Sequence, residues 1–433
     1  MSETVEIKNS ALTKAHVRWP IITEEDKKAV LTVLDRGVFS GPFAPEVQAL
    51  EKEFSSYVGS KYCLATNSGT SALHIGLAAL GIGPGDEVIV PAFTFVATAM
   101  AVLHQNAIPI FVDIEPVSFG MDPKQLEAAI TPLTRAIIPV HMHGTPCNLE
   151  EILKIAKRYK IPVLEDACQA HGAIYQDKKV GSIGTLAAFS LQSSKNLSCG
   201  EGGLLVSGDE NLILRANRVR MFGEDIKPHD ALQYRIDRPL DADRAYDSVT
   251  VGWMYRTTEM SAALARSQLK NLDYWNENAR KNAAYLSKTL SKLPGVEVPK
   301  VPDDRISVFH KYRVCLDATK MGIDVLSKTV RDVMVSALRK EGVDAVLWQT
   351  QPVPGQTVFK EKIGFGKGCP WELGLPVNYD LMQYPETIKL LDRSLCLFSH
   401  TFPIACQPME ICQAYAEIFA NIWNSIDRIL PKQ

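Results

Sequence analysis

Features that would place this chain in a membrane or an export pathway are missing from its 433 residues. No stretch of about 18 uninterrupted apolar residues is present that could span a bilayer. The first residues, MSETVEIKNSALTKAHVRWP, carry charges throughout and lack the apolar core of a secretion signal. We therefore expect a soluble cytoplasmic protein.

The chain also lacks an excess of charge of either sign and lacks paired cysteines. Its formal net charge is -2, so no long-range field would attract nucleic acid or an anionic membrane. The nine cysteines are scattered singly without a C-x-x-C pair, which argues against a disulfide framework and against a zinc site. No G-x-G-x-x-G follows an apolar run and no G-x-x-x-x-G-K-[ST] is present, which disfavours a nucleotide-dependent oxidoreductase or a P-loop enzyme.

Short apolar runs alternate with longer amphipathic segments between residues 61 and 206. The runs are YCLAT, DEVIVPAFT, IPIFVDI, TRAIIPVHM, IPVLEDA, LAAFSLQ and GGLLVSG, with helices expected between them, for example at 70–80 and 149–159. Such alternation is typical of βαβ units on a mostly parallel sheet. The sequence therefore predicts an α/β fold with helices on the sheet.

A different pattern follows this region. It comprises a long helical stretch at 258–293, a strand in VFHKYRVCLD, and helices at 327–342 and 408–430. Because the chain exceeds the size of a single hydrophobic core, we expect an N-terminal arm (1–30), a large domain (31–290) and a smaller C-terminal α+β domain (291–433). The polar segment 228–246 is expected to be a long exposed loop.

The segment FSLQSSKNLSCGEGG (189–203) places Lys195 among small and hydroxyl residues, between an apolar strand and a glycine-rich turn. Small neighbours would let a cofactor ring approach the amine, and burial would lower its pKa so that it could attack a carbonyl. The alternative is a solvated loop lysine beside a turn, and the segment alone does not decide between the two.

Two further segments favour the cofactor. In VLEDACQAHG, Asp166 ends an apolar strand, at the edge where ligands bind in open α/β sheets, and a carboxylate there could keep a pyridine nitrogen protonated. Its alternative role is a helix N-cap, and Gln169 could equally be a surface polar residue. In TNSGTSAL (66–73), a small-residue turn opens a helix whose free N–H groups suit a phosphate, although a plainly capped helix start has the same pattern.

Together and in this order, these motifs resemble the DegT-type family of pyridoxal phosphate-dependent sugar aminotransferases. The resemblance covers about residues 18–320 and includes GVFSGPF, the run 66–102, PIFVDIEPVSFGMDP, AIIPVHMHG and MYRTTEMSAAL. It implies the aspartate aminotransferase (fold type I) architecture, with a mostly parallel seven-stranded sheet. It also implies pyridoxal 5'-phosphate as the cofactor.

The resemblance assigns roles position by position. Lys195 resembles the Schiff-base lysine and general acid/base, and Asp166 the partner of the pyridine nitrogen. The other implied cofactor contacts are Ser68, Gly69, Thr70 and Ser190 for the phosphate, Gln169 for the ring hydroxyl and Phe95 for the ring face. His310 falls where the family often has a histidine near the substrate, although it could equally be a partly buried strand histidine.

Two departures from the family pattern concern other contacts. Where the family has GYNYRMSE, whose asparagine reaches the partner subunit's phosphate, this chain has VGWMYRTTE with Met254, and a thioether cannot donate a hydrogen bond. Trp253 or Arg256 could replace that contact, and Arg256 is also a candidate substrate residue. In the C-terminal part, Trp348 and His400 are candidate substrate contacts that lean toward the cyclitol and aminobenzoate branches.

The resemblance implies a ping-pong transamination in which glutamate or glutamine donates an amino group to a keto sugar or ketocyclitol. Antibiotic, other secondary-metabolite or surface-sugar biosynthesis is the implied setting, and a homodimer with sites at its interface is the implied assembly. The alternatives are a non-catalytic or regulatory homologue on the same fold, and a metal hydrolase using His141 and His143. We expect no metal, because alternating histidines in a strand point to one face and lack carboxylate partners nearby, and strand packing or a turn role is the alternative for them.

Overall fold

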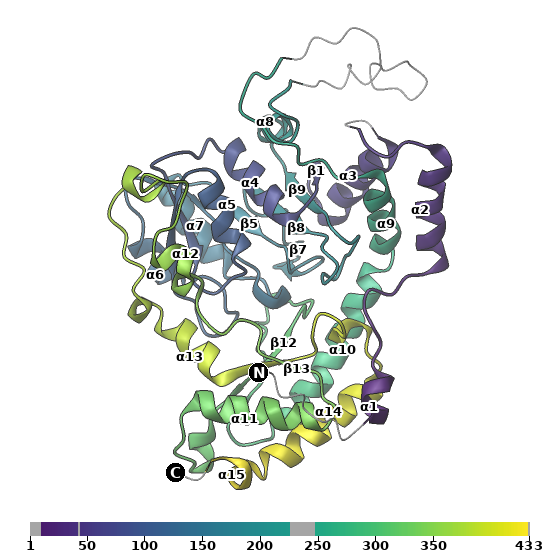
Figure 1. Cartoon of the computed structure of the whole chain (residues 1–433), viewed down its shortest axis with the longest axis vertical. Coiled ribbons are helices and arrows are strands. Elements are labelled where there is room, and N and C mark those ends of the chain that lie inside the picture. The colour runs from purple at the N-terminus through teal and green to yellow at the C-terminus, as the bar shows by residue number, and fades with distance from the viewer. Residues whose placement is uncertain (1–9, 42–43, 226–246, 432–433) are drawn as a thin grey trace.

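Seven strands form one sheet at the centre of the larger part of the molecule (Figure 1). The computed structural model describes residues 10–41, 44–225 and 247–431, so the loop expected at 228–246 lies outside the described residues. In spatial order the strands are β1 (Tyr62–Thr66), β9 (Gly203–Ser207), β8 (Leu186–Ser190), β5 (Leu164–Asp166), β4 (Thr134–Ile137), β2 (Glu87–Pro91) and β3 (Ile108–Val112). Parallel bridges from Ile137 to Val163 and from Val140 to Asp166 join β4 to β5.

Only β9 runs antiparallel to its neighbours within this sheet, so the prediction of a mostly parallel seven-stranded sheet is confirmed. Each strand coincides with one of the seven apolar runs of the sequence. Continuous apolar runs suit such strands because both faces of the sheet are covered.

Helices cover the two faces of the sheet. Ala187 and Phe189 of β8 pack into a core with α3 (Pro45–Val58), α6 (Pro123–Ala128), α7 (Leu149–Tyr159) and α9 (Glu259–Leu269). Leu186 and Ala188 face the opposite core, formed with α4 (Gly69–Ala79), α5 (Ala97–His104) and α8 (Glu210–Arg220). Successive side chains of the strand point to opposite faces of the sheet, so they fill both cores. The fold thus has three layers, with helices on each side of the sheet.

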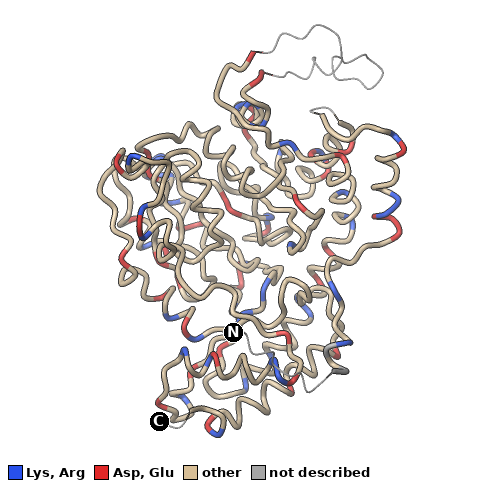
Figure 2. The backbone as a smooth tube through the Cα atoms, in the orientation of Figure 1, with Lys and Arg blue, Asp and Glu red and all other residues tan. Residues whose placement is uncertain are grey.

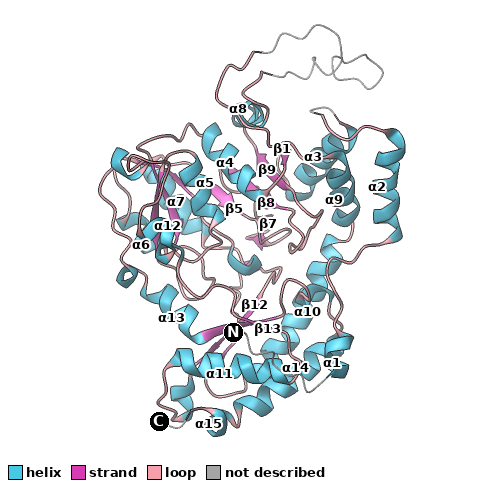
Figure 3. Ribbon diagram, in the orientation of Figure 1, coloured by secondary structure: helices cyan, strands magenta, loops and turns pink. Residues whose placement is uncertain are grey.

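A smaller α+β region lies below the large sheet in Figure 3. Its antiparallel sheet has the order β10 (Val296–Glu297), β12 (Tyr312–Leu316), β14 (Ser394–Leu397) and β13 (Ala345–Val346). One face packs on α10 (Leu272–Leu290), α11 (Ser327–Lys340) and α14 (Met409–Trp423), and Leu12 of α1 (Ser10–Ala15) joins the same core. The long helical pattern predicted at 258–293 is two helices, because the chain breaks between α9 and α10 at Lys270 and Asn271.

The chain returns from the small sheet to the large one after residue 352. Val353, Phe359, Trp371, Tyr379 and Tyr384 pack into the core beside β2 and β3, and the Tyr379 hydroxyl donates to the Pro109 carbonyl at 2.8 Å. This segment contains η4 (Val353–Gly355), α12 (Thr357–Lys360), η5 (Trp371–Leu373) and η6 (Leu381–Gln383). Residues 353–384 therefore pack on the large sheet, although they come after the predicted domain boundary at residue 290. That boundary stays a prediction.

The remaining elements are α2 (Glu24–Arg36), α13 (Pro385–Arg393), α15 (Ile426–Ile429), the short strands β6 (Ile174–Tyr175), β7 (Lys178–Lys179) and β11 (Arg305–Ile306), and the 3-10 turns η1 (Met142–Gly144), η3 (Ala318–Met321) and η7 (Ile404–Cys406). Acidic and basic residues are interspersed over the described backbone in Figure 2, in keeping with the small net charge. Among the described helices, none has the length and apolar character needed to cross a bilayer.

Candidate active site

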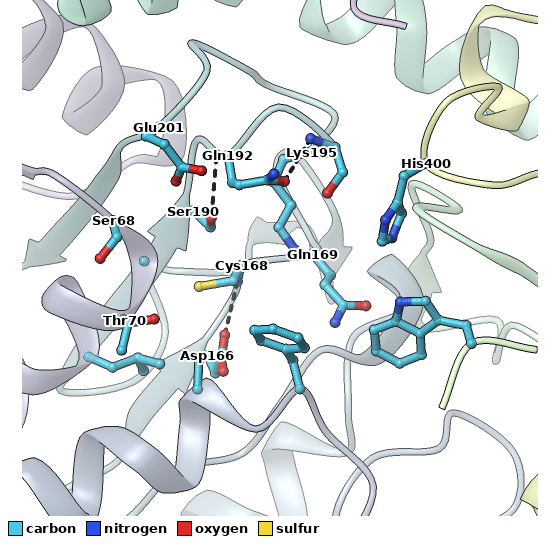
Figure 4. Close-up of a pocket in the computed structure, with 16 residues that line it drawn as sticks. Ser68, Thr70, Asp166, Cys168, Gln169, Ser190, Gln192, Lys195, Glu201 and His400 are labelled. Carbon is cyan, nitrogen blue, oxygen red and sulfur yellow. Dashed lines mark hydrogen bonds between the residues drawn. The ribbon is translucent and has the colours of Figure 1, made fainter. Parts of the chain in front are cut away.

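A cavity of about 340 Å³ opens where the parallel strands of the large sheet end. Its walls come from the turns that follow β1, β2, β5 and β8, with two residues from the C-terminal part of the chain. The predicted residues that it brings together are Ser68, Gly69, Thr70, Phe95, Asp166, Gln169, Ser190, Lys195, Trp348 and His400. In Figure 4, Ser68 and Thr70 lie at one end of the cavity and His400 at the other, with Lys195 and Gln169 between them.

Lys195 lies in the turn after β8 and lines this cavity. Burial lowers the pKa of its amine, and the nearby Asp166 carboxylate opposes that effect. A lowered pKa increases the fraction of neutral amine at neutral pH, which is the form that attacks a carbonyl. The alternative of a solvated loop lysine does not fit this position.

Asp166 is fixed by two hydrogen bonds and is only 5% exposed. Its Oδ2 accepts from the Thr98 hydroxyl at 2.7 Å, and its Oδ1 accepts from the Cys168 backbone N–H at 3.1 Å. The sequence left open a helix N-cap as the alternative role of Asp166, but no helix begins there, and the second bond lies within a turn. Each oxygen retains capacity for a further donor, so these bonds are compatible with a role toward a ligand in the cavity.

The N-terminus of α4 forms a cradle for an anion. The Ser68 hydroxyl caps the helix by accepting from the Ser71 backbone N–H at 3.0 Å, while the N–H groups of Gly69 and Thr70 have no acceptor within the described residues. A Cβ at Gly69 would lie 2.7 Å from the Ser190 Cβ and 2.9 Å from the Cys168 sulfur. The missing side chain thus lets the helix start approach β8, and free N–H groups at a helix N-terminus suit a phosphate.

Gln169 and Phe95 provide the remaining predicted cofactor contacts. The Gln169 Oε1 accepts from the His143 backbone N–H at 3.0 Å, which leaves its amide nitrogen to donate to an oxygen in the cavity. Phe95 is 54% exposed although it lines a cavity, so an apolar ring face is available for stacking. A phosphate cradle, a ring face, a carboxylate and an amine of lowered pKa fit pyridoxal phosphate.

Two predicted substrate residues do not line this cavity. His310 is buried behind it, where its Nδ1 lies 3.2 Å from the Asn196 Oδ1 and its ring lies 6.0 Å from the His400 ring. Arg256 lies away from the cavity lining, as does Met254, which is 47% exposed. Trp253 packs against His74, with ring centroids 4.6 Å apart. Within one chain, none of residues 253, 254 and 256 lines the cavity.

The expectation that His141 lacks a carboxylate partner is wrong. Its Nε2 lies 3.0 Å from the Glu165 Oε2, and the pair is fully buried. His143 instead accepts a hydrogen bond from Arg313 at 2.9 Å. The two histidines therefore have separate partners, and no cluster of three potential metal ligands exists in the described part of the chain.

The cavity also contains residues that the sequence analysis did not name: Leu73, Ala97, Cys168, Gln192, Ser194 and Glu201. All of them lie in the same sequence motifs as the predicted site residues, so these motifs could have been used to predict them. Burial raises the pKa of the Cys168 thiol well above its ordinary value, so this thiol stays protonated.

Comparison with known proteins identifies close relatives. A model described as the DegT/DnrJ/EryC1/StrS aminotransferase family matches residues 20–370. The chain is 37% identical over 350 residues to a protein named pleiotropic regulatory protein from Geobacillus stearothermophilus, covering 80% of this chain and 86% of that protein. It is 35% identical over 330 residues to dTDP-3-amino-3,4,6-trideoxy-alpha-D-glucose transaminase from Streptomyces venezuelae, covering 76% and 79%. The crystal structure of 3-amino-5-hydroxybenzoic acid synthase superposes with a TM-score of 0.80 at 28% identity, covering 94% and 98%.

Proposed function

The chain belongs to the DegT/DnrJ/EryC1/StrS aminotransferase family, and from that premise we propose that it moves an amino group from glutamate or glutamine to a keto sugar or ketocyclitol. It is an aminotransferase whose cofactor is pyridoxal phosphate. The observation that carries the proposal is the cavity that combines the Lys195 amine, the Asp166 carboxylate and the cradle at the start of α4.

Different residues of the cavity would contact different parts of the cofactor. Lys195 would form the covalent bond, Asp166 would face the ring nitrogen, and Ser68, Gly69, Thr70 and Ser190 would surround the phosphate. Gln169 would donate to the ring hydroxyl, and Phe95 would cover one ring face. When bound, pyridoxal phosphate supplies an aldehyde carbon that accepts amines and a ring that withdraws electrons.

Lys195 has a second role as the group that moves a proton. Its amine lies in the same cavity and, when not bonded to the cofactor, would take a proton from the alpha carbon of the donor. The pKa lowered by burial keeps part of the population neutral and able to act as a base. Asp166 is held in place by the Thr98 hydroxyl and the Cys168 backbone N–H.

Substrate choice would depend on the end of the cavity that Trp348 and His400 form, with His310 behind them. We propose a homodimer in which residues 253–256 of one subunit, including Arg256, contribute to the site of the other. A cytoplasmic location and a role in secondary-metabolite or surface-sugar biosynthesis stay predictions.

A second candidate is a non-catalytic regulatory protein on the same fold, favoured by the name of the relative from Geobacillus stearothermophilus. A purely regulatory protein would not need the amine of lowered pKa and the fixed carboxylate in one cavity. That combination favours the enzyme.

The test is borohydride reduction of the purified chain after incubation with pyridoxal phosphate, followed by peptide mapping. We expect a covalent adduct at Lys195, its loss in Lys195→Arg, and its retention in the control Lys179→Arg, which changes a lysine stacked on Tyr57 outside the cavity. The visible spectrum should then change on addition of glutamate or glutamine. Absence of the adduct from the native chain would overturn the proposal, and an adduct without any spectral change by amino donors would favour the regulatory candidate.

A further inference from the structure

The residue that follows Lys195 is buried outside the cavity, against two distant parts of the chain. Asn196 is 8% exposed and does not line the cavity that contains the lysine. Its amide nitrogen donates to the Asn276 Oδ1 at 3.0 Å and to the Val308 carbonyl at 3.3 Å. Its own Oδ1 lies 3.2 Å from the Nδ1 of His310. One side chain next to Lys195 therefore has three partners that lie 80 to 114 residues away in the sequence.

These contacts fix a turn that belongs to no helix or strand. Residues 191–202 have no regular secondary structure, and the Lys195 backbone N–H donates to the Gln192 carbonyl within the same turn. Asn276 belongs to α10, whose Leu272 packs in the core of the large region and whose Leu286 packs in the core of the small region. The Asn196 side chain thus ties the turn of the lysine to the helix that joins the two regions.

Two backbone carbonyls determine how the asparagine amides are oriented. A carbonyl only accepts, so the Asn196 group that faces the Val308 carbonyl is the NH2 group. The Asn276 group that faces the His171 carbonyl at 2.8 Å is an NH2 group for the same reason. The Asn276 Oδ1 then accepts from Asn196, and the Asn196 Oδ1 faces His310. An amide oxygen also only accepts, so the Nδ1 of His310 must carry a proton.

His310 is neutral in this position. Burial keeps its pKa well below the ordinary value, and the positive charges of Lys195 and Lys311, followed by His400 and His143, act in the same direction. A neutral ring carries one proton, so Nε2 has a lone pair and no N–H. Within the described residues this buried Nε2 has no hydrogen-bond partner. An N–H at that atom would be an unsatisfied buried donor, which also favours the proton on Nδ1.

The charge of His310 matters for the chemistry at Lys195. A positive charge on the imidazole would disfavour protonation of the nearby lysine amine. In the proposed reaction Lys195 has to take up a proton and release it again. A neutral His310 therefore leaves the lysine able to accept that proton.

We propose that Asn196 is a positioning residue for Lys195, which fixes the turn of the lysine and holds His310 in the neutral form with its proton on Nδ1. The inference rests on the proposed aminotransferase function, in which Lys195 moves a proton. Asn196 acts indirectly, because its side chain contacts neither the cavity nor a reactant. Positioning matters for such a step, since a displacement of about 1 Å can slow a reaction by about a hundredfold.

The first test measures the donor half-reaction by stopped flow, as the change in the visible spectrum when the cofactor-loaded protein is mixed with glutamate or glutamine. We expect Asn196→Leu to lower the limiting rate at saturating donor by about tenfold to a hundredfold. The donor concentration at half-saturation should change little, because Asn196 does not line the cavity.

The matched control is Asn282→Leu. Asn282 of α10 is likewise a buried asparagine outside the cavity, and it donates to the carbonyls of Ile404 at 2.9 Å and Gln407 at 2.8 Å. Urea unfolding should show a comparable loss of stability in both variants. Only Asn196→Leu should lower the rate, which separates positioning from a general loss of stability.

The second test reads the protonation of His310 directly, by nitrogen NMR of protein that contains isotope-labelled histidine. The His310 signals are identified by their absence from His310→Gln. We expect a protonated Nδ1 and an unprotonated Nε2 in the native chain and in Asn282→Leu. In Asn196→Asp, the carboxylate beside Nδ1 should raise the pKa of His310, so that both nitrogens are protonated near neutral pH.

A native rate in Asn196→Leu, or an equal fall of the rate in Asn282→Leu, would overturn the inference. A native His310 that carries its proton on Nε2 would overturn it as well. If Asn196→Leu does not fold, Asn196→Asp replaces it in the rate measurement, where the lost bonds to Asn276 and Val308 should also slow the half-reaction. The borohydride adduct and the response of the native chain to amino donors are scored separately. Their absence would overturn the proposed function without changing the NMR result for His310, so the two failures are distinguishable.

Discussion

Lys195 and Asp166 show how much of a site can depend on single side chains. Burial lowers the pKa of the Lys195 amine, and the Asp166 carboxylate accepts hydrogen bonds from the Thr98 hydroxyl and the Cys168 backbone N–H. The two groups line the same cavity. Such a pairing is typical of a catalytic site.

A pH dependence of stability follows from Lys311. Burial lowers the pKa of this lysine from 10.5 to about 8 in the folded protein. Between these values the unfolded chain binds more protons than the folded one, so stability contributed by this group rises with pH. The destabilisation is absent above 10.5, grows as the pH falls, and is complete below about 8.

We therefore expect Lys311→Met to stabilise the ligand-free protein, and to do so by about 2 kcal/mol more at about pH 7 than at about pH 9.5. Urea unfolding of the native chain and the variant at the two pH values measures the difference. Lys300→Met, which removes an exposed lysine, should show no such dependence on pH. Equal gains at both pH values for Lys311→Met would contradict the lowered pKa.

Individual residues differ in how visible they are in the sequence. Lys195, Asp166 and Gly69 lie in turns at the ends of apolar runs, so local pattern made them candidates, and the order of the motifs together with the family resemblance favoured their roles. Lys311 and Arg313 look like ordinary polar positions of a strand. Their burial depends on the pairing of β12 with β14, about eighty residues away, and on the large sheet that covers them, and neither is a local property.

At the scale of elements, the turn between β1 and α4 is the most constrained part of the cradle. A side chain at Gly69 would meet Ser190 of β8 and the sulfur of Cys168, both closer than 3.0 Å. The helix could accept a methyl group only by moving away from β8. Such overpacking typically costs about 1–3 kcal/mol.

Gly69→Ala should therefore weaken pyridoxal phosphate binding by about tenfold or more, since 1.4 kcal/mol corresponds to a factor of ten. Equilibrium dialysis of the apo protein against the cofactor measures the affinity, and urea unfolding measures the accompanying loss of stability. Gly208→Ala is the matched control, because a Cβ there meets nothing within 4 Å. An unchanged affinity in Gly69→Ala would show that the close approach of α4 to β8 does not shape the cradle.

Elements with one dominant pattern could be predicted, and those shaped by distant contacts could not. The seven apolar runs became the seven strands because each had to fill a sheet buried on both faces. The break between α9 and α10 was missed because helical periodicity continues across Lys270 and Asn271 while the two helices pack into different cores. The segment from Val353 to Tyr384 was assigned to the small domain by its place in the chain, although its aromatic side chains pack beside β2 and β3.

At the scale of the whole molecule, an apolar surface lies where residues 221–224 and 248–254 pair. Bridges join Met221 to Met254 and Glu224 to Ser248, and the nearby Phe222, Val249 and Val251 are 50%, 54% and 74% exposed. Exposed apolar side chains gathered in one place are typical of an interaction surface. This surface includes the segment that we propose to reach the partner subunit's site.

Val251→Asp should therefore convert the proposed dimer into a monomer, because a charge buried at an interface without a partner costs several kcal/mol, which weakens association by roughly a hundredfold or more. Sedimentation equilibrium of the native chain and the variant measures the change, and the cofactor affinity should fall with it if residues 253–256 complete the partner's site. Leu326→Asp is the control, since Leu326 is 79% exposed on the small region, away from this surface. A native chain that sediments as a monomer, or a Val251→Asp protein that stays dimeric, would contradict the interface. A monomeric variant with unchanged cofactor affinity would keep the interface and show that each chain binds its cofactor alone.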